Sequence, residues 1–226
     1  EATKIAEGNG FKSIENYETL KIGDKVYYTN RGKNIILAVV GKDKIESGAN
    51  IIVSHADVPR LDLKGNPLYE DIELAMMKTH YYGGIKKYQW VSIPLALHGV
   101  VILEDGTKVD IIIGEDENDP VFTIPDILPH LARKVQGERK AGEVIKGEEL
   151  NVLIGSIPST IEDKDIKEKV KYAVLEKLNE KYGMVEEDFI SAELQIVPAF
   201  KAKDVGLDRA IVGAYGHDDR VCGFTS

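Results

Sequence analysis

Two short apolar runs lie near the start of the chain, each bounded by turn-forming residues. Residues 34–40 read Asn-Ile-Ile-Leu-Ala-Val-Val before Gly41, and residues 50–54 read Asn-Ile-Ile-Val-Ser. Both runs are continuous rather than alternating and are rich in β-branched residues, which is typical of strands buried on both faces of an α/β sheet. Residues 25–33 resemble a strand that enters a turn, so the pattern predicts a hairpin into 34–40.

The pattern changes at about residue 78. Residues 78–88 are rich in Tyr, Gly and Lys, and short strand-like runs follow at 91–96, 99–103 and 109–114. Asp105-Gly106 stands between the last two runs and is a strong hairpin signal, because glycine readily adopts the positive φ that tight hairpin turns require. This part of the chain therefore reads as an antiparallel β section.

One helix and two further strands are predicted in the last third of the chain. Residues 163–182 place apolar side chains at helical spacing, with Lys and Glu elsewhere, and Gly183 is a suitable helix stop. Residues 193–199 alternate polar and apolar side chains as a half-exposed strand does. Residues 210–216 are apolar and glycine-rich, and lead into a motif discussed below.

These elements predict a discontinuous layout. An α/β domain begins the chain at residues 1–77, a β-rich insertion occupies 78–204, and the first domain resumes at 205–226. No internal repeat or low-complexity tract interrupts this order.

Composition narrows the class of protein. The chain has 226 residues, of which 43% are apolar and 30% charged, values that suit a folded globular protein. Its net charge of -9 argues against nucleic acid and against an anionic membrane surface as partners. The single cysteine, Cys222, rules out an internal disulfide and fits a reducing compartment, so we expect a cytoplasmic location.

The chain contains no candidate membrane span and shows signs of belonging to a longer polypeptide. No apolar run approaches the roughly 20 residues needed to span a bilayer. The chain begins at Glu1 without an initiating Met, and it stops at Ser226 directly after an apolar, motif-like stretch. We therefore expect both ends to be cuts in a longer chain.

The first candidate site is Ser54-His55-Ala56-Asp57, at the end of the second apolar run. Ligands of α/β sheets bind at the carboxyl ends of strands, where His55 is expected. Asp57 follows two residues later, so both side chains project to the same side of an extended chain. A carboxylate beside an imidazole can fix its tautomer and raise its basicity as a metal ligand. The alternative is a strand end with a surface contact between His55 and Asp57.

The second candidate site is Gly216-His217-Asp218-Asp219-Arg220. Two adjacent carboxylates after an apolar strand are costly to bury unless a cation pairs with them. A metal ion is one such cation and Arg220 is another, so a loop with an Asp–Arg ion pair remains open. A carboxylate can also bridge two metal ions through its two oxygens. His55 and Asp218 supply the nitrogen and oxygen donors that zinc hydrolases use.

Residues 54–69, 81–84 and 216–220 together resemble the aspartyl-aminopeptidase family of dinuclear zinc aminopeptidases, most closely its bacterial branch. The resemblance follows nearly the whole chain in the same order. It implies an α/β fold, namely a mixed-sheet zinc-exopeptidase catalytic domain with an inserted β-rich oligomerisation domain. It also implies two zinc ions in each complete active site.

The resemblance assigns roles to residues of both motifs. His55 would bind one zinc ion, and Asp57 would orient His55. Asp218 would bridge both metals. The family's general base and remaining ligands follow the bridging Asp, whereas this chain continues for only eight residues after Asp218.

The inserted domain implies a homo-oligomer, with a dodecamer as one candidate. Within it, residues 124–133 resemble a segment whose histidine reaches the active site of a neighbouring subunit, where it would stabilise the oxyanion. That histidine is His130 here. From the residues alone, His130 reads instead as a partly buried helix histidine.

The expected activity is hydrolysis of N-terminal residues from peptide substrates, with acidic residues as the family's usual preference. The residues alone leave two other classes of protein open. One is a metal-dependent phosphoesterase, which also uses His and Asp at strand ends. The other is a non-catalytic assembly or binding module dominated by residues 78–204.

Overall fold

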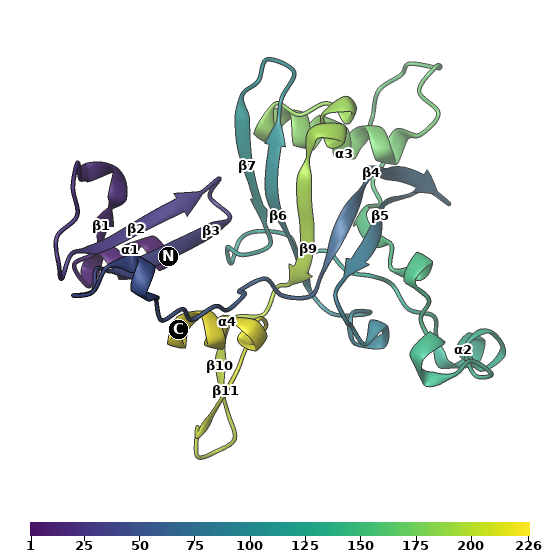
Figure 1. The fold of residues 1–226 in the computed structure, drawn as a ribbon. Helices are drawn as coiled ribbons and strands as arrows, with labels where there is room; N and C mark the ends of the chain where they lie inside the picture. Colours follow the sequence, from purple (N-terminus) through teal and green to yellow (C-terminus); the bar gives the residue numbers. More distant parts are fainter. The chain divides into compact units, whose positions relative to one another are not determined.

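The computed structural model describes residues 1–226, which divide into two compact units. The first unit comprises Glu1–Ala56 and Asp219–Ser226, and the second comprises Asp57–Asp218. Figure 1 shows the elements of each. No helix in the structure combines the length and hydropathy needed to cross a membrane.

The first unit is built on a small mixed sheet in the order β1-β2-β3. Its elements are α1 (Ala2–Gly8), β1 (Lys12–Ser13), η1 (Ile14–Asn16), β2 (Lys25–Asn30), β3 (Asn34–Val39) and η2 (Ile45–Ser47). β1 runs parallel to β2, and β2 and β3 form an antiparallel hairpin. The turn uses Arg31 and Gly32, both at positive φ (52° and 67°). The predicted hairpin is confirmed.

Within this chain, the two apolar runs are not buried as predicted. In β3, Ile36 and Val39 are 62% and 59% exposed. Residues 50–54 form no strand, and Ile51, Ile52 and Val53 are 75–85% exposed. The reason is that β3 pairs only with β2, so its other edge and the segment that follows have no partner strand in the sheet. A continuous apolar run predicts a strand covered on both faces only where other elements supply that cover.

The second unit is organised around a six-stranded antiparallel sheet in the order β7-β6-β9-β4-β5-β8 (Figure 1). The strands are β4 (Arg60–Asp71), β5 (Leu74–Tyr82), β6 (Leu95–Ile102), β7 (Lys108–Ile113), β8 (Val152–Gly155) and β9 (Glu193–Pro198). The predicted hairpin at Asp105-Gly106 joins β6 to β7, with Gly106 at φ 84°. The strand predicted at 91–96 is present only from Leu95, and that predicted at 193–199 is confirmed as β9.

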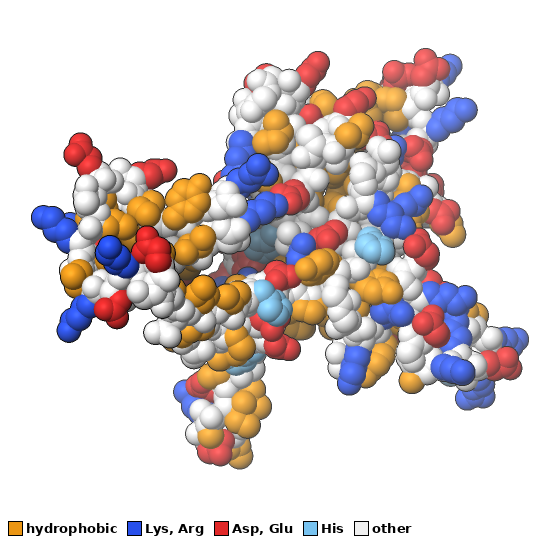
Figure 2. Space-filling view, in the orientation of Figure 1, with side chains coloured by type: hydrophobic (Ala, Val, Ile, Leu, Met, Phe, Trp, Pro, Cys, Tyr) orange, Lys and Arg blue, Asp and Glu red, His pale blue; other side chains and the backbone are white.

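Helices and short turns of helix complete the second unit. They are η3 (Lys87–Gln89), α2 (Pro129–Val135), η4 (Ala141–Glu143), η5 (Gly147–Glu149), α3 (Lys169–Tyr182) and η6 (Glu186–Ser191). A separate hairpin of β10 (Lys203–Val205) and β11 (Ile211–Gly213) lies outside the main sheet. Figure 2 shows hydrophobic side chains on its surface, and Leu207 at its turn is fully exposed.

The core of the second unit lies on the main sheet. Leu61 of β4 and Ile196 of β9 are direct partners, and neither has any exposed surface. α3 contacts β4, β5 and β8, and buries Val170 and Leu178. The close approach of β6 to β9 requires glycine at position 99, because a Cβ built there would lie 1.9 Å from the carbonyl oxygen of Glu193.

The predicted helix at 163–182 ends as expected but begins later. Gly183 has φ 72° and caps the end of α3, whose first residue is Lys169. Glu70 of β4 fixes this start, because its Oε2 accepts hydrogen bonds from the backbone N–H groups of Val170 (2.8 Å) and Lys171 (2.9 Å). A carboxylate at a helix N-terminus satisfies otherwise unpaired donors and interacts favourably with the helix dipole.

The compact units divide the chain between residues 56 and 57 and between 218 and 219. The domain limits predicted from the sequence lie at 77/78 and 204/205 and stay a prediction. The β-rich character expected for the middle of the chain agrees with the strands of the main sheet.

Candidate active site

His55 lies beside a carboxylate within the first unit. Its Nδ1 is 3.2 Å from Oδ2 of Asp219, and the two side chains are 68% and 24% exposed. Helix α4 (His217–Thr225) brings Asp219 to this position. A Cβ built on Gly223 of the same helix would lie 3.4 Å from the Cβ of Ala56, so the helix packs closely against the chain next to His55. An imidazole and a carboxylate are therefore held together here.

Asp57 lies in the second unit and is held by a tyrosine. The hydroxyl of Tyr82, at the end of β5, donates a hydrogen bond to Asp57 Oδ2 at 2.6 Å. This bond is the main cause of the raised pKa of Tyr82, because the neighbouring carboxylate disfavours the phenolate. One oxygen of the Asp57 carboxylate therefore accepts a hydrogen bond from the Tyr82 hydroxyl.

Asp218 has an exposed side chain and an extended backbone, with φ -86° and ψ 111°, inside the span of α4. The chain that leads to it is anchored by Tyr215. The Tyr215 hydroxyl donates to the carbonyl oxygen of Pro59 at 2.6 Å, and its ring meets Trp90 edge-on at 6.3 Å between centroids. The segment before Asp218 therefore lies beside the segment that follows Asp57.

The donor types in these segments fit zinc, which accepts imidazole nitrogen and carboxylate oxygen. The number of donors brought together is smaller than a zinc site requires. Within neither unit do three or more His, Cys, Asp or Glu side chains gather closely enough to hold a metal ion. His55 and Asp218 belong to different units, so their joint role in one site stays a prediction.

His130 is exposed in the first turn of α2, not partly buried. The apolar residues of this helix and of the turn before it are also exposed: Leu128 is 67%, Leu131 58% and Val135 53% exposed. Their spacing of three and four residues places them on one face of the helix. This face has no partner within the chain.

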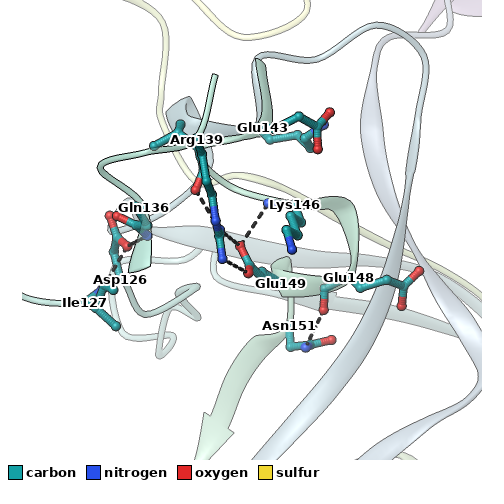
Figure 3. A network of polar contacts seen from close by, with 11 residues as sticks. Asp126, Ile127, Gln136, Arg139, Glu143, Lys146, Glu148, Glu149 and Asn151 are labelled. Atoms are coloured by element: carbon teal, nitrogen blue, oxygen red, sulfur yellow. Dashed lines mark hydrogen bonds and ion pairs between the residues drawn. The ribbon is translucent and has the colours of Figure 1, made fainter. Parts of the chain in front are cut away.

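The loop after α2 is held by a polar network (Figure 3). Arg139 forms a two-pronged ion pair with Glu149, with Nη–Oε distances of 2.7 and 2.9 Å, and also donates to the carbonyl of Val144. The backbone N–H of Lys146 donates to Glu149 at 2.9 Å. Hydrogen bonding to Arg139 is the main cause of the lowered pKa of Glu149. The network fixes the shape of the segment that follows α2.

A further hydrogen bond connects the two ends of α2. The side-chain amide of Gln136 donates to Asp126 Oδ1 at 2.9 Å, and the backbone N–H of Ile127 donates to the same oxygen. Asp126 therefore connects the segment before α2 with Gln136, the residue that follows the helix (Figure 3). His130 lies between these two anchored points.

The structure adds residues to those that the sequence singled out. Asp219 contacts His55, Tyr82 contacts Asp57, and Tyr215 anchors the chain before Asp218. The doubled carboxylate at 218–219 was a local signal for Asp219. The two tyrosines had no such signal, because their partners lie 25 and 156 residues away in the sequence.

Comparison with known proteins places this chain among metallopeptidases. Residues 1–226 match the aminopeptidase I zinc metalloprotease (M18) family over their whole length. The chain belongs to this family, which confirms the resemblance found in the sequence.

Curated relatives carry the same family name. The chain is 57% identical over 230 residues to a probable M18 family aminopeptidase 1 of Clostridium acetobutylicum, covering 100% of this chain and 49% of the relative. It is 49% identical over 226 residues to the protein of that name in Thermotoga maritima, with 100% and 48% covered. The chain thus spans about half the length of the curated relatives it matches.

Solved structures confirm the α/β fold. The M18 family aminopeptidase of Thermotoga maritima matches with a TM-score of 0.91 at 49% identity, over 99% of this chain and 48% of that one. Aminopeptidase I of Clostridium acetobutylicum matches with a TM-score of 0.88 at 55% identity, over 99% and 49%. The S. cerevisiae mApe1 dodecamer, at 20% identity and a TM-score of 0.65, shows the shared fold.

Proposed function

We propose that this chain forms part of a zinc-dependent aminopeptidase that removes N-terminal residues from peptides, with a preference for acidic residues. The observation that carries the proposal is the 2.6 Å hydrogen bond from Tyr215 to Pro59. It ties the segment leading to Asp218 to the segment following Asp57, both within the second unit. Membership of the zinc metalloprotease family supports the same activity.

The residues of this chain have distinct roles in the proposal. His55 and Asp218 would hold metal, and Asp57 would orient His55. When bound, zinc would supply Lewis acidity that polarises the scissile carbonyl. His130 donates a hydrogen bond to the developing oxyanion. A carboxylate outside this chain takes the proton from water.

The exposed apolar residues of the first unit support completion of the site by further polypeptide. Ile51, Ile52 and Val53 directly precede the His55 motif and are 75–85% exposed. Contiguous exposed apolar surface of this kind marks a contact site. The relatives are about twice as long as this chain. We therefore propose that residues 1–77 and 205–226 belong to a catalytic domain, with 78–204 inserted for assembly.

The apolar face of α2 supports a homo-oligomer in which His130 acts on a neighbouring subunit. Leu128, Leu131 and Val135 present this face beside His130 without a partner in the chain. A yeast relative has been solved as a dodecamer, and we propose an assembly of that kind here. The single cysteine supports a cytoplasmic location.

The activity can be tested on the complete polypeptide that contains this sequence. Zinc-loaded protein is assayed on glutamyl, aspartyl and leucyl arylamides and on an aryl phosphate ester. We expect hydrolysis of the aminoacyl amides, faster for the acidic ones, and loss of this activity in His55→Ala. Hydrolysis of the phosphate ester alone would replace the aminopeptidase proposal with a phosphoesterase.

A further inference from the structure

The six-stranded sheet of the second unit has one closed edge and one open edge. At β8, the backbone N–H of Leu153 donates to the carbonyl of Thr123 at 2.8 Å, so the segment at Thr123 covers that edge. β8 is also only four residues long, and its pairing with β5 shifts register, both of which protect a sheet edge. At the opposite edge, β7 pairs with β6 alone.

β7 is a regular strand with a free row of backbone groups. Its six residues keep an unbroken register with β6, from Lys108 opposite Ile102 to Ile113 opposite Leu97. In an antiparallel pair, every second residue directs its N–H and C=O away from the partner strand. Near the end of β7, the carbonyl of Ile112 accepts a hydrogen bond from the Tyr182 hydroxyl at 3.3 Å. The open edge of residues 108–111 has no partner of this kind, so another strand can pair there.

Two opposite charges lie on the outer face of β7. Lys108 and Asp110 are two residues apart, so both side chains project to the same face of the strand, and they are 64% and 74% exposed. The other face of β7 packs into the core, where Ile111 has no exposed surface. A charged edge ordinarily discourages pairing with another strand. An edge with one charge of each sign discourages it only in registers that bring like charges together.

We propose that β7 is a contact surface between copies of the chain, at which it pairs antiparallel with β7 of a second copy about a two-fold axis through Val109. This register places Lys108 of each copy opposite Asp110 of the other, which forms two cross-strand ion pairs. A shift of the axis by one residue would set Lys108 opposite Lys108, or Asp110 opposite Asp110. Like charges directly opposite are destabilising, so the charge pattern selects the register centred on Val109 over both of its neighbours.

Apolar side chains beside the two charges belong to the same surface. Ile102, the ladder partner of Lys108, is 40% exposed, and Ile112 is 53% exposed. In the proposed register, Ile112 lies diagonal to Lys108 of the second copy, whose methylene stem can cover it. A two-fold contact buries the same patch on both copies, so each of these gains is made twice.

This inference goes beyond the proposed function and does not depend on the metal site. β7 lies within residues 78–204, the segment that we propose to serve assembly. The surface that it offers is different from the apolar face of α2. Its failure and the failure of the proposed homo-oligomer are therefore separate results.

The test is a pair of complementary charge variants of the complete polypeptide that contains this sequence, studied by sedimentation velocity. Lys108→Glu places a carboxylate opposite Asp110 of the second copy, and Asp110→Lys places an ammonium group opposite Lys108. Each variant alone has two like-charge pairs at the contact, so we expect its dissociation constant to rise about 10- to 100-fold. An equimolar mixture of the two variants has opposite charges at both pairs and should associate as the wild type does.

The matched control is Lys177→Glu, which makes the same change of charge at an exposed position of α3. Its association should equal that of the wild type. Urea unfolding, followed by the fluorescence of Trp90, shows whether each variant is folded. Recovery in the mixture cannot come from a contact within one chain, because neither chain of the mixture regains its own pair of opposite charges.

Two results would overturn the inference and leave the proposed homo-oligomer standing on other contacts. One is association of either single variant at the strength of the wild type. The other is a mixture that associates no better than its two components. Amide hydrogen exchange at residues 108–110 that is equally slow in Lys108→Glu and in the wild type would also overturn it, because polypeptide outside this chain would then cover the edge. A wild-type protein that stays monomeric would overturn the homo-oligomer and this inference together.

Discussion

A buried hydrogen bond between β5 and the chain after η5 provides a quantitative test of the fold. Thr79 is 3% exposed, and its hydroxyl donates to the carbonyl oxygen of Leu150, a residue with no exposed surface, at 2.5 Å. Thr79→Val keeps the shape of the side chain and removes the donor. No cavity forms, so the cost is that of a buried carbonyl that loses its partner, about 1–2 kcal/mol in the free energy of unfolding.

The assay is urea unfolding followed by tryptophan fluorescence. Trp90 is the only tryptophan, is 7% exposed and lies in the second unit, so its signal reports on that unit. With a urea slope of about 2 kcal/mol per molar, the midpoint should fall by about 0.5–1 M. The matched control is Thr123→Val in the same unit, whose hydroxyl makes no hydrogen bond, with a change within about 0.5 kcal/mol. Equal midpoints for Thr79→Val and the wild type would refute the reasoning.

Three further predictions address packing, pH and assembly. Gly99→Ala should destabilise the second unit by about 3 kcal/mol or more in the same urea assay, because its Cβ would meet the Glu193 carbonyl oxygen at 1.9 Å. Because Arg139 lowers the pKa of Glu149 below 4.5, the pair stabilises the fold above that pH. The difference in urea midpoint between wild type and Arg139→Met should therefore be largest at pH 6 and above, and it should shrink as the pH falls below 4.5. His130→Ala should lower peptidase activity about 100-fold or more with zinc content unchanged, whereas loss of zinc would contradict its assignment to the oxyanion.

Local signals predicted the elements that depend on neighbouring residues. The β2–β3 hairpin follows from a turn sequence that tolerates positive φ at Arg31 and Gly32. The β6–β7 hairpin follows in the same way from Asp105-Gly106, and the end of α3 from Gly183. In each case the residues that determine the conformation lie within a few positions of one another.

Elements that depend on distant partners were not predictable in the same way. The start of α3 is set by Glu70, which lies 100 residues before Val170. The run at 50–54 has the composition of a buried strand, yet the sheet of the first unit offers it no neighbour. The composition of a segment shows that it is able to form a buried strand, but it forms one only where another strand pairs with it.

The candidate site shows the same division. His55, Asp57 and Asp218 are predicted as site residues from short motifs and from the resemblance that those motifs carry, and they stay a prediction. The tyrosine hydrogen bonds to Asp57 and to Pro59 were not predicted, because Tyr82 and Tyr215 are common residues whose partners are set by the folded chain. Short motifs indicate the chemistry of a candidate site, whereas contacts between residues far apart in the sequence are found only in the folded structure.

Zinc content is the most direct test of the central claim, that His55 and Asp218 hold metal in an aminopeptidase. The complete polypeptide and its His55→Ala, Asp218→Ala double variant are incubated with excess zinc, dialysed and measured for zinc per chain. The account predicts about two zinc ions per wild-type chain, as in two-metal hydrolases, and their loss in the variant. Equal zinc content in both proteins, or none in either, would contradict it.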